Sequence, residues 1–393
     1  MNTVGIICEY NPFHLGHAGH IEKTRQALGE ESAVVGIMSG NYVQRGDFAI
    51  LCKHTRAKMA VLCGVNLVIE LPAPYALLSA EGFAKAGVYI LDKLGICDFL
   101  SFGSESGSIG ILRDAARAAR SEEAQRSVKE WLDKGLSYAS AQQKAADTVF
   151  GERSGVFKSP NNLLGIEYIK ALESYGSAIH PLTVYRTGGD HDSETGYSAS
   201  ALRKTLVRDS IPLEFMPGAA AAVCMEDFAE GRGTVFMKRN ESAVLSRLRA
   251  IKDYSELPYA TDGLEYRFKK FAATEPTVAS ILEKAKTKRY TMSRLRRLLM
   301  CAVLGIKAED SRKPPPYARI LAMDSIGMKL LGMARKKTEL PVIVKPASVY
   351  KLSDHARRIF NLEAAATDLY ALAYRDEEKR RGGQEWRQPP VIV

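Results

Sequence analysis

The sequence lacks long hydrophobic runs, cysteine pairs and an N-terminal targeting segment. No apolar stretch approaches the roughly 18 residues that a membrane-spanning helix needs. The six cysteines are scattered along the 393 residues and form no CxxC pair, which argues against structural zinc and a disulfide framework. The N-terminus has neither a basic start nor a small-residue cleavage site, so we expect no signal peptide. These absences predict a cytoplasmic protein with reduced thiols and no membrane partner.

Acidic residues are outnumbered by basic ones. The chain carries 55 Lys and Arg against 45 Asp and Glu, a formal net charge of +10. Such an excess favours polyanionic partners through counterion release and electrostatic steering. Because many basic proteins bind no nucleic acid, charge alone leaves this partner open.

The first half of the chain alternates short β-branched apolar runs with helix-like stretches. The runs are typical of strands buried on both faces of a parallel sheet, and they cover 3–10, 32–39, 65–72, 97–104 and 182–188. The helix-like stretches between them cover 16–28, 53–63, 76–94, 109–120 and 161–174. This alternation predicts an α/β fold with a Rossmann-like parallel sheet, whose ligands bind beyond the carboxyl ends of the strands.

Two changes of pattern suggest how the chain is divided. Residues 121–158 form a polar, mostly helical insertion, whose GERSGVFKSP ending is typical of a loop. Beyond about residue 215 helical periodicity dominates and strand-like runs are few. We therefore predict a Rossmann-like domain over 1–214, including the insertion, and a mainly α-helical domain over 215–393.

The stretch EYNPFHLGHAGH (9–20) follows the first predicted strand and holds three histidines. Asn11-Pro12 breaks the strand and a helix is expected to begin near Gly16, so His14 and His17 flank a helix N-terminus. Helix N-termini attract anions, and imidazoles can donate hydrogen bonds to phosphate oxygens as charge develops. A zinc site would need a third ligand, which His20 could supply, but no carboxylate follows in HExxH fashion. We predict a phosphate site and no metal ligand here.

A second phosphate-binding pattern is YSASALRK at 197–204, before a predicted helix. Together the two stretches resemble the HxGH nucleotidyltransferase superfamily, whose second motif is ISSTxxR. Ser198, Ser200 and Arg203 match that motif, while Ala199 and Ala201 depart from its second Ser and its Thr. The resemblance implies that ATP binds on a Rossmann-like sheet and is attacked at its α-phosphate, with Ser198, Ser200 and Arg203 holding the β- and γ-phosphates.

Six ordered motifs narrow the resemblance to one family. They are VGIICEYNPFHLGHAGHI, MSGNYVQRGDFA, GVNLVIELP, FGSE, SPNNLLGIEYIKAL and SASALRK. In this order and spacing they resemble the bacterial tRNA(Met) cytidine acetate ligases, through residues 1–210 and more loosely beyond. The resemblance implies that ATP and acetate give acetyl-adenylate and pyrophosphate. The acetyl group then passes to N4 of the wobble cytidine of elongator methionine tRNA, and the helical half is expected to bind that tRNA.

The resemblance also implies a set of ATP-binding residues, with His14 and His17 as the catalytic pair. The set is Ile7, Cys8, Glu9, Tyr10, Asn11, Pro12, Phe13, His14, Leu15, Gly16, His17, Ala18, Gly19, His20, Gly103, Asn161, Asn162, Arg186, Ser198, Ser200 and Arg203. Asn161 and Asn162 also open a helix after Pro160, so helix capping remains an alternative for them.

Other polar stretches are less specific. Gln44, Arg45 and Asp47 in QRGD, after the second strand, could order either a small carboxylate or the incoming cytosine. Lys53 and Arg56 on the next helix are equally compatible with solvated charges, and the loop 188–193 could close on substrate or bind Mg²⁺.

For tRNA the strongest candidate is KTKRYTMSRLRR (286–297), which is basic and carries a tyrosine that could stack on a base. Its candidate residues are Lys286, Lys288, Arg289, Tyr290, Arg294, Arg296 and Arg297.

Two other functions remain open from the residues alone. A small-molecule adenylyltransferase of the pantetheine phosphate or nicotinamide mononucleotide type would explain both phosphate motifs, but it would leave the basic helical half without a role. A non-catalytic tRNA-binding protein on the same fold is the other alternative, against which the intact His14, Gly16 and His17 argue. Mg²⁺ is expected to accompany the phosphates, without an assigned protein ligand.

Overall fold

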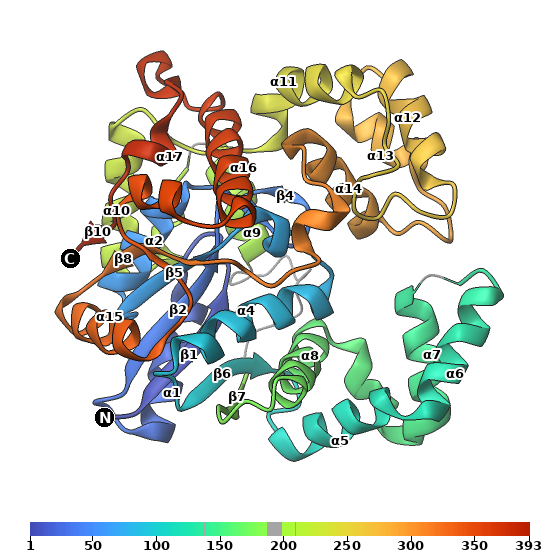
Figure 1. The fold of residues 1–393 in the computed structure, drawn as a ribbon, viewed down its shortest axis with the longest axis horizontal. Coiled ribbons are helices and arrows are strands. Elements are labelled where there is room, and N and C mark those ends of the chain that lie inside the picture. Colours follow the sequence, from blue (N-terminus) through green and yellow to red (C-terminus); the bar gives the residue numbers. More distant parts are fainter. Residues whose placement is uncertain (137, 187–198, 209) are drawn as a thin grey trace.

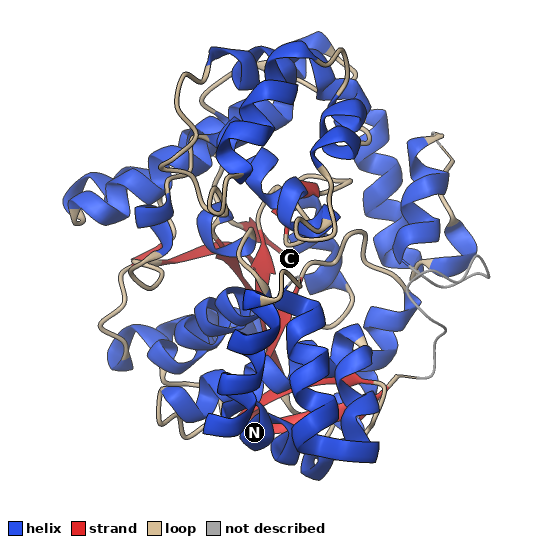
Figure 2. Ribbon diagram, turned by 90° about the vertical axis from the view of Figure 1, so that its right-hand side faces the viewer, coloured by secondary structure: helices blue, strands red, loops and turns tan. Residues whose placement is uncertain are grey.

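The computed structural model describes residues 1–136, 138–186, 199–208 and 210–393. These residues form a central sheet with helices on both faces (Figures 1 and 2). The strand order is β10-β8-β5-β2-β1-β6-β7, and β9 also pairs with β8. The strands are β1 (Thr3–Cys8), β2 (Ala33–Ser39), β5 (Leu67–Leu71), β6 (Phe99–Ser104), β7 (His180–Tyr185), β8 (Ala318–Met323), β9 (Val342–Ile343) and β10 (Val391–Ile392). A separate hairpin joins β3 (Tyr42–Val43) to β4 (Asp47–Phe48).

The five strands expected from the sequence are all present, and they pair in parallel as β5-β2-β1-β6-β7. Successive side chains point to opposite faces, so Ile7 and Ile37 join one hydrophobic core while Ile6 and Val34 join the other. Both faces are buried, which explains why these strands are nearly continuous apolar runs. The predicted α/β fold class is confirmed.

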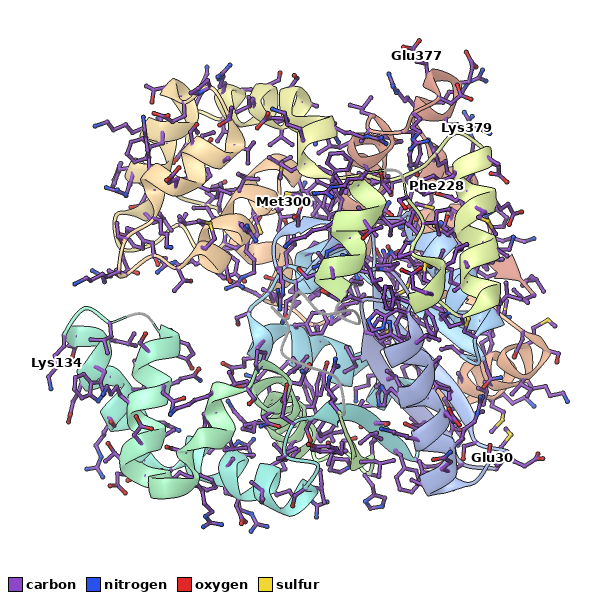
Figure 3. All side chains as sticks on the ribbon, turned by 180° about the vertical axis from the view of Figure 1, so that it is seen from behind. Glu30, Lys134, Phe228, Met300, Glu377 and Lys379 are labelled. Atoms are coloured by element: carbon purple, nitrogen blue, oxygen red, sulfur yellow. The ribbon has the colours of Figure 1, made fainter. Side chains whose placement is uncertain are left out.

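Each face of the sheet has its own layer of helices. One core includes residues of α4 (Ala80–Leu94), α8 (Pro160–Ser174) and α15 (Ser325–Lys337), and the other includes residues of α1, α2 and α10. The latter three are α1 (Leu15–Leu28), α2 (Lys53–Leu62) and α10 (Gly218–Ala229). Figure 3 shows their side of the molecule, with Phe228 on α10 labelled in its upper right part. The helix α4 lies so close to β1 that a Cβ on Gly87 would stand 2.7 Å from Ile7 Cδ1.

The segment 121–158 is helical, as expected, and extends to one side of the molecule, with Lys134 at its tip (Figure 3). It follows α5 (Ile109–Arg120) and consists of α6 (Glu122–Asp133), α7 (Tyr138–Phe150) and the 3-10 helix η1 (Gly151–Lys158). The prediction of a loop at GERSGVFKSP is wrong for the residues of η1. Val156 and Phe157 are buried in the adjoining core, and this packing holds the backbone in helical turns.

Beyond residue 214 helices predominate, as expected. Besides α10 and α15 they are α11 (Met237–Ala250), α12 (Leu264–Thr274), α13 (Val278–Ala285), α14 (Met292–Leu304), α16 (Asp354–Ala371) and α17 (Gln384–Arg387). Helices α11 to α14 pack on one another at one side of the molecule (Figure 1). Shorter elements elsewhere are α3 (Ala73–Ala76), α9 (Ala199–Val207), η2 (Leu213–Phe215), η3 (Ala308–Ser311), η4 (Pro346–Lys351) and η5 (Glu377–Arg380).

The C-terminal part also contributes strands, which the sequence analysis did not expect. β8 pairs antiparallel with β5, and β9 and β10 pair in parallel with β8. The boundary predicted at residue 214 therefore does not coincide with the end of the sheet. Within the described residues no helix combines the length and hydrophobicity needed to cross a bilayer.

A cluster of buried charges joins this added part to the first half. Lys53 Nζ lies 2.6 Å from Glu70 Oε1 and 2.7 Å from Glu385 Oε2, and Arg319 Nε lies 2.9 Å from Glu385 Oε1. Burial alone would raise the pKa of Glu385, but Lys53 and Arg319 lower it to about 2. Burial and the Glu70 carboxylate raise the pKa of the neighbouring Glu363 well above its usual range, and Lys53 acts against that rise. Lys53 and Arg319 thus face the buried carboxyl groups of Glu70, Glu385 and Glu363, and of the two interpretations left open for Lys53 the solvated charge is wrong.

Replacing Lys53 with methionine is expected to destabilise the fold by about 3–5 kcal/mol, because two buried carboxylates would then share one cation. Urea unfolding followed by circular dichroism measures the loss. The matched control is Lys58→Met on the same helix, whose pair with Glu226 is partly exposed; we expect a change within about 0.5 kcal/mol there. Equal losses in the two variants would contradict the buried-pair account.

Candidate active site

The predicted ATP-binding stretch forms a turn at the carboxyl edge of the sheet. β1 ends at Cys8, Tyr10 takes a left-handed conformation with φ of 45°, and the Asn11–Pro12 peptide is cis. Tyr10 and Phe13 are buried and their rings pack edge to face, 4.8 Å between centroids. The chain therefore leaves the strand, crosses the sheet edge and enters α1 within a few residues.

The two histidines of the motif form the cap of α1. His14 is the N-cap residue, and its Nδ1 accepts a hydrogen bond from Gly16 N at 3.0 Å. His17 Nδ1 accepts from His14 N at 3.2 Å, which completes a reciprocal capping box. The two rings stack with centroids 3.8 Å apart. A Cβ on Gly16 would stand 2.9 Å from His14 Cε1, so the glycine makes room for this ring.

This cap fixes the chemistry of both imidazoles. Because each Nδ1 accepts a backbone hydrogen bond, a neutral ring carries its proton on Nε2 and is a donor there. The sequence analysis expected this helix N-terminus to attract an anion, and N-termini ordinarily do so through unpaired N–H groups. Instead, Gly16 N donates to the His14 ring and His17 N donates to His14 O at 2.8 Å. The imidazole donors and the helix dipole, rather than these amides, are the groups that can attract phosphate.

His17 and His20 are neutral at physiological pH. Burial, the neighbouring His14 and the charge of Arg186 lower the pKa of His17 well below its usual range. Burial and Arg186 lower the pKa of His20 to about 4. His20 Nε2 lies 3.0 Å from Ser101 Oγ on β6, so this histidine ties α1 to the sheet.

Gly103 and Arg186, which are far apart in the sequence, come together next to these histidines. β6 and β7 pair in register, and Arg186 N donates to Ser104 O at 3.0 Å. A Cβ on Gly103 would stand 2.9 Å from Arg186 Cγ, so the arginine side chain lies across the glycine. The predicted residues after β1, β6 and β7 therefore share one edge of the sheet, as parallel strands require.

Asn161 and Asn162 lie at the start of α8, but the side-chain oxygen of Asn162 already accepts hydrogen bonds from the protein. Its buried side-chain oxygen accepts hydrogen bonds from Glu105 N and Ser106 N, both at 3.0 Å. The Glu105 carboxylate in turn accepts from Asn161 Nδ2 at 2.6 Å and from Asn162 N at 3.0 Å. Asn162 thus shapes the loop after β6, and Glu105 is a residue that the sequence analysis missed.

The second phosphate motif is partly described. Ser198 and the loop 188–193 lie outside the described residues. Ser200 and Arg203 belong to α9, and Arg203 Nη1 donates to Asn11 O at 2.9 Å. The arginine therefore holds the histidine turn directly.

QRGD forms the turn of the β3–β4 hairpin beside the histidine turn. Gln44 N donates to Glu9 Oε1 at 2.7 Å, and Arg45 is exposed. Burial raises the pKa of Asp47, while the charges of Arg296 and Arg203 lower it. Asp47 is therefore close to both the second motif and α14.

The hairpin also packs tightly against the basic segment. Gly46 has φ of 76°, and a Cβ on it would stand 2.4 Å from the carbonyl carbon of Arg296. This contact places the start of α14 next to the turn that carries His14. The glycine of QRGD indicated that another segment approaches the backbone closely at this position. No feature of the sequence identified α14 as that segment.

Some residues of the basic segment are exposed, and others are held by contacts within the protein. Lys286, Lys288, Arg289 and Arg296 are exposed. Tyr290 is 8% exposed, and its hydroxyl donates to Asp262 O. The expectation that this ring stacks on a base is therefore wrong, because it is packed into the helical cluster. Arg289 and Arg294 also pair with Asp262, at 3.0 and 3.2 Å, and Arg297 lies over the Tyr259 ring.

Arg56, which was equally compatible with a solvated charge, is fully buried beneath the turn. A cavity of about 230 Å³ lies elsewhere, at the N-terminus of α2, lined by residues such as Asp227 and Gln384 but by none from Ile7 to His20. Among the described residues no group of three or more His, Cys, Asp or Glu is arranged to hold a metal ion.

A mostly parallel sheet with a histidine-capped helix after its first strand defines a nucleotidyltransferase of the HxGH class. In agreement, the family model described as HIGH Nucleotidyl Transferase matches residues 1–385. The tRNA(Met) cytidine acetate ligase of Acetivibrio thermocellus is 39% identical over 416 residues, covering 100% of both chains. That of Caldanaerobacter subterraneus is 37% identical over 388 residues, covering 96% of each.

Two solved structures match over the whole chain. Crystal structures of Thermotoga maritima TmcAL, one bound with alpha-thio ATP and one apo, have TM-scores of 0.93 and identities of 31% and 30%, with 100% of each chain covered. The chain belongs to the tRNA(Met) cytidine acetate ligase family, and the resemblance found in the sequence is confirmed.

The lowered pKa of His20 can be measured directly. Imidazole NMR is expected to give a midpoint near pH 4, because burial and Arg186 disfavour its cation. The unfolded imidazole takes up its proton near pH 6.5, so stability from His20 is present above that pH and is lost as the pH falls toward 4. The exposed His180 at the start of β7 is the control. A His20 midpoint near 6.5 would contradict its burial beside Arg186.

Proposed function

We propose that the chain is an ATP-dependent RNA-modifying ligase that activates acetate and transfers the acetyl group to N4 of the wobble cytidine of elongator methionine tRNA. The observation that carries this proposal is the pair of histidines whose Nδ1 atoms are occupied and whose Nε2–H groups are donors. The family name and the alpha-thio ATP complex of the Thermotoga maritima relative support ATP as the nucleotide.

In the first half-reaction an acetate oxygen attacks the α-phosphorus of ATP. The bond from that phosphorus to the bridging oxygen breaks, and pyrophosphate leaves with the electron pair. His14 and His17 donate from Nε2 to the phosphate oxygens on which charge builds, and the α1 dipole adds to this stabilisation. The site also includes Arg186, which is close enough to lower the pKa of both His17 and His20. The other residues of the predicted ATP-binding set are proposed to contact ATP as well.

In the second half-reaction the cytosine amine attacks the acyl carbon, AMP leaves, and the nitrogen loses a proton. The RNA must present this base unstacked. We assign tRNA contact to the exposed part of the basic segment, Lys286, Lys288, Arg289 and Arg296, and we leave Tyr290 out. Asp47 is close to both Arg203 of the site and Arg296 of the basic segment. The basic segment is therefore a neighbour of the site, which supports its assignment to tRNA contact.

Mg²⁺ is proposed to enter with ATP. It usually keeps several waters and needs only one or two carboxylates besides phosphate oxygens, which fits a chain whose described residues show no three-ligand metal cluster. The ion would neutralise the charge of the phosphates, and no protein ligand is assigned to it.

The deciding experiment incubates the protein with ATP, labelled acetate and total tRNA, and then analyses the nucleosides. Label in N4-acetylcytidine, with release of AMP and pyrophosphate, is the expected result. Retention of the nucleotide in a small-molecule product would favour a small-molecule adenylyltransferase. ATP binding without any AMP release would favour a non-catalytic tRNA-binding protein.

His14→Asn is expected to lower acetate-dependent exchange of pyrophosphate into ATP by about a hundredfold or more. Asparagine is a good N-cap, so the helix start survives while the Nε2 donor is removed. His180→Asn, at the opposite edge of the sheet, is the control and should retain exchange. An unchanged rate in His14→Asn would remove the imidazole from the chemistry.

Lys288→Gln is expected to weaken tRNA binding several-fold and to reduce the slope of log affinity against log salt by about one. Filter binding at several salt concentrations measures both. Lys93→Gln, which removes an exposed charge at the end of α4, is the control and should change neither quantity. Equal slopes for Lys288→Gln and the wild type would exclude this lysine from the interface.

A further inference from the structure

Arg56 is a fully buried arginine that donates to four backbone carbonyls. Its Nε donates to Leu51 O at 2.9 Å and its Nη1 to Glu9 O at 2.5 Å, while Nη2 donates to Ser39 O at 3.1 Å and to Gly40 O. Glu9 follows β1, and Ser39 and Gly40 are at the end of β2. The guanidinium thus joins the carboxyl ends of two parallel strands at the edge that carries the histidine turn.

The charge of Arg56 is balanced differently from that of the other fully buried cations. Lys53 and Arg319 each lie within 2.9 Å of a carboxylate oxygen. Among the described residues no carboxylate lies within ion-pair distance of Arg56. Burial lowers the pKa of Arg56, and Tyr370, Cys52, Glu9 and Cys8 act against that electrostatically. Carbonyl dipoles solvate the cation, but they do not cancel its net charge.

We infer that Arg56 is a positioning residue that holds the histidine turn and places a fixed positive charge beneath the bound triphosphate. In a water-poor interior such a charge is screened weakly, so it acts over a longer distance than a surface lysine does. ATP is strongly anionic and adenosine is uncharged. Arg56 therefore favours the phosphates specifically, in addition to ordering the turn. This inference rests on the proposed binding of ATP at the turn.

The test compares ATP with adenosine for two variants. Arg56→Gln removes the charge and is expected to weaken ATP binding on the order of tenfold while leaving adenosine within about twofold of the wild type. Arg56→Lys keeps the charge and is expected to retain most of the ATP affinity. Isothermal titration at a temperature where each variant is folded gives both constants, and thermal unfolding reports stability separately.

Arg319→Gln is the matched control, because Arg319 is equally buried but is paired with Glu385. It is expected to lose stability without changing the ratio of ATP to adenosine affinity. If Arg56→Gln weakens both ligands equally, or neither, the charge has no role and the inference is overturned. If Arg56→Gln does not fold, Arg56→Lys decides: retained binding of both ligands supports the inference, and loss of both overturns it. Failure of the wild type to bind ATP would instead refute the proposed function.

Discussion

The strand β1 is hydrogen-bonded in parallel to β2 on one side and to β6 on the other. Because carboxyl ends of parallel strands meet at the same edge, this pairing gathers the segments that follow all three strands. The histidine turn follows β1, the QRGD hairpin follows β2 and the loop that begins at Glu105 follows β6. The contacts of the site, from Gln44 to Glu9 and from His20 to Ser101, depend on this arrangement.

At this edge of the sheet, His14 and His17 combine two roles, helix capping and the proposed ligand contact, that are usually divided between different residues. Ser, Thr, Asp or Asn usually caps a helix, and a separate side chain contacts the ligand. Here Nδ1 of His14 and of His17 does the capping, and in the proposed function Nε2 is left to contact the ligand. The ring orientation is consequently set by the backbone before any nucleotide arrives, which lowers the entropic cost of ordering the donors.

The sequence allowed the five parallel strands to be predicted, since each is an apolar run long enough to stand out. It did not reveal β8, because ARILAM lies among helical segments, nor β9 and β10, which have two residues each. Burial of Lys53 and Arg56 was equally hidden, because their partners are distant carboxylates or backbone carbonyls. Tyr290 was misread for the same reason: a tyrosine among arginines can face solvent or the helices behind it, and only packing distinguishes the two.

The buried Lys53 has a consequence for how the chain reaches its final state. One of its carboxylate partners, Glu70, follows soon after it in the sequence, but Glu385 is separated from it by most of the helices and strands of the fold. Until Glu385 has been synthesised, the ammonium group of Lys53 can enter the interior only at the cost of an incomplete ion pair. The charge cluster is therefore complete only when segments from both halves of the chain have come together.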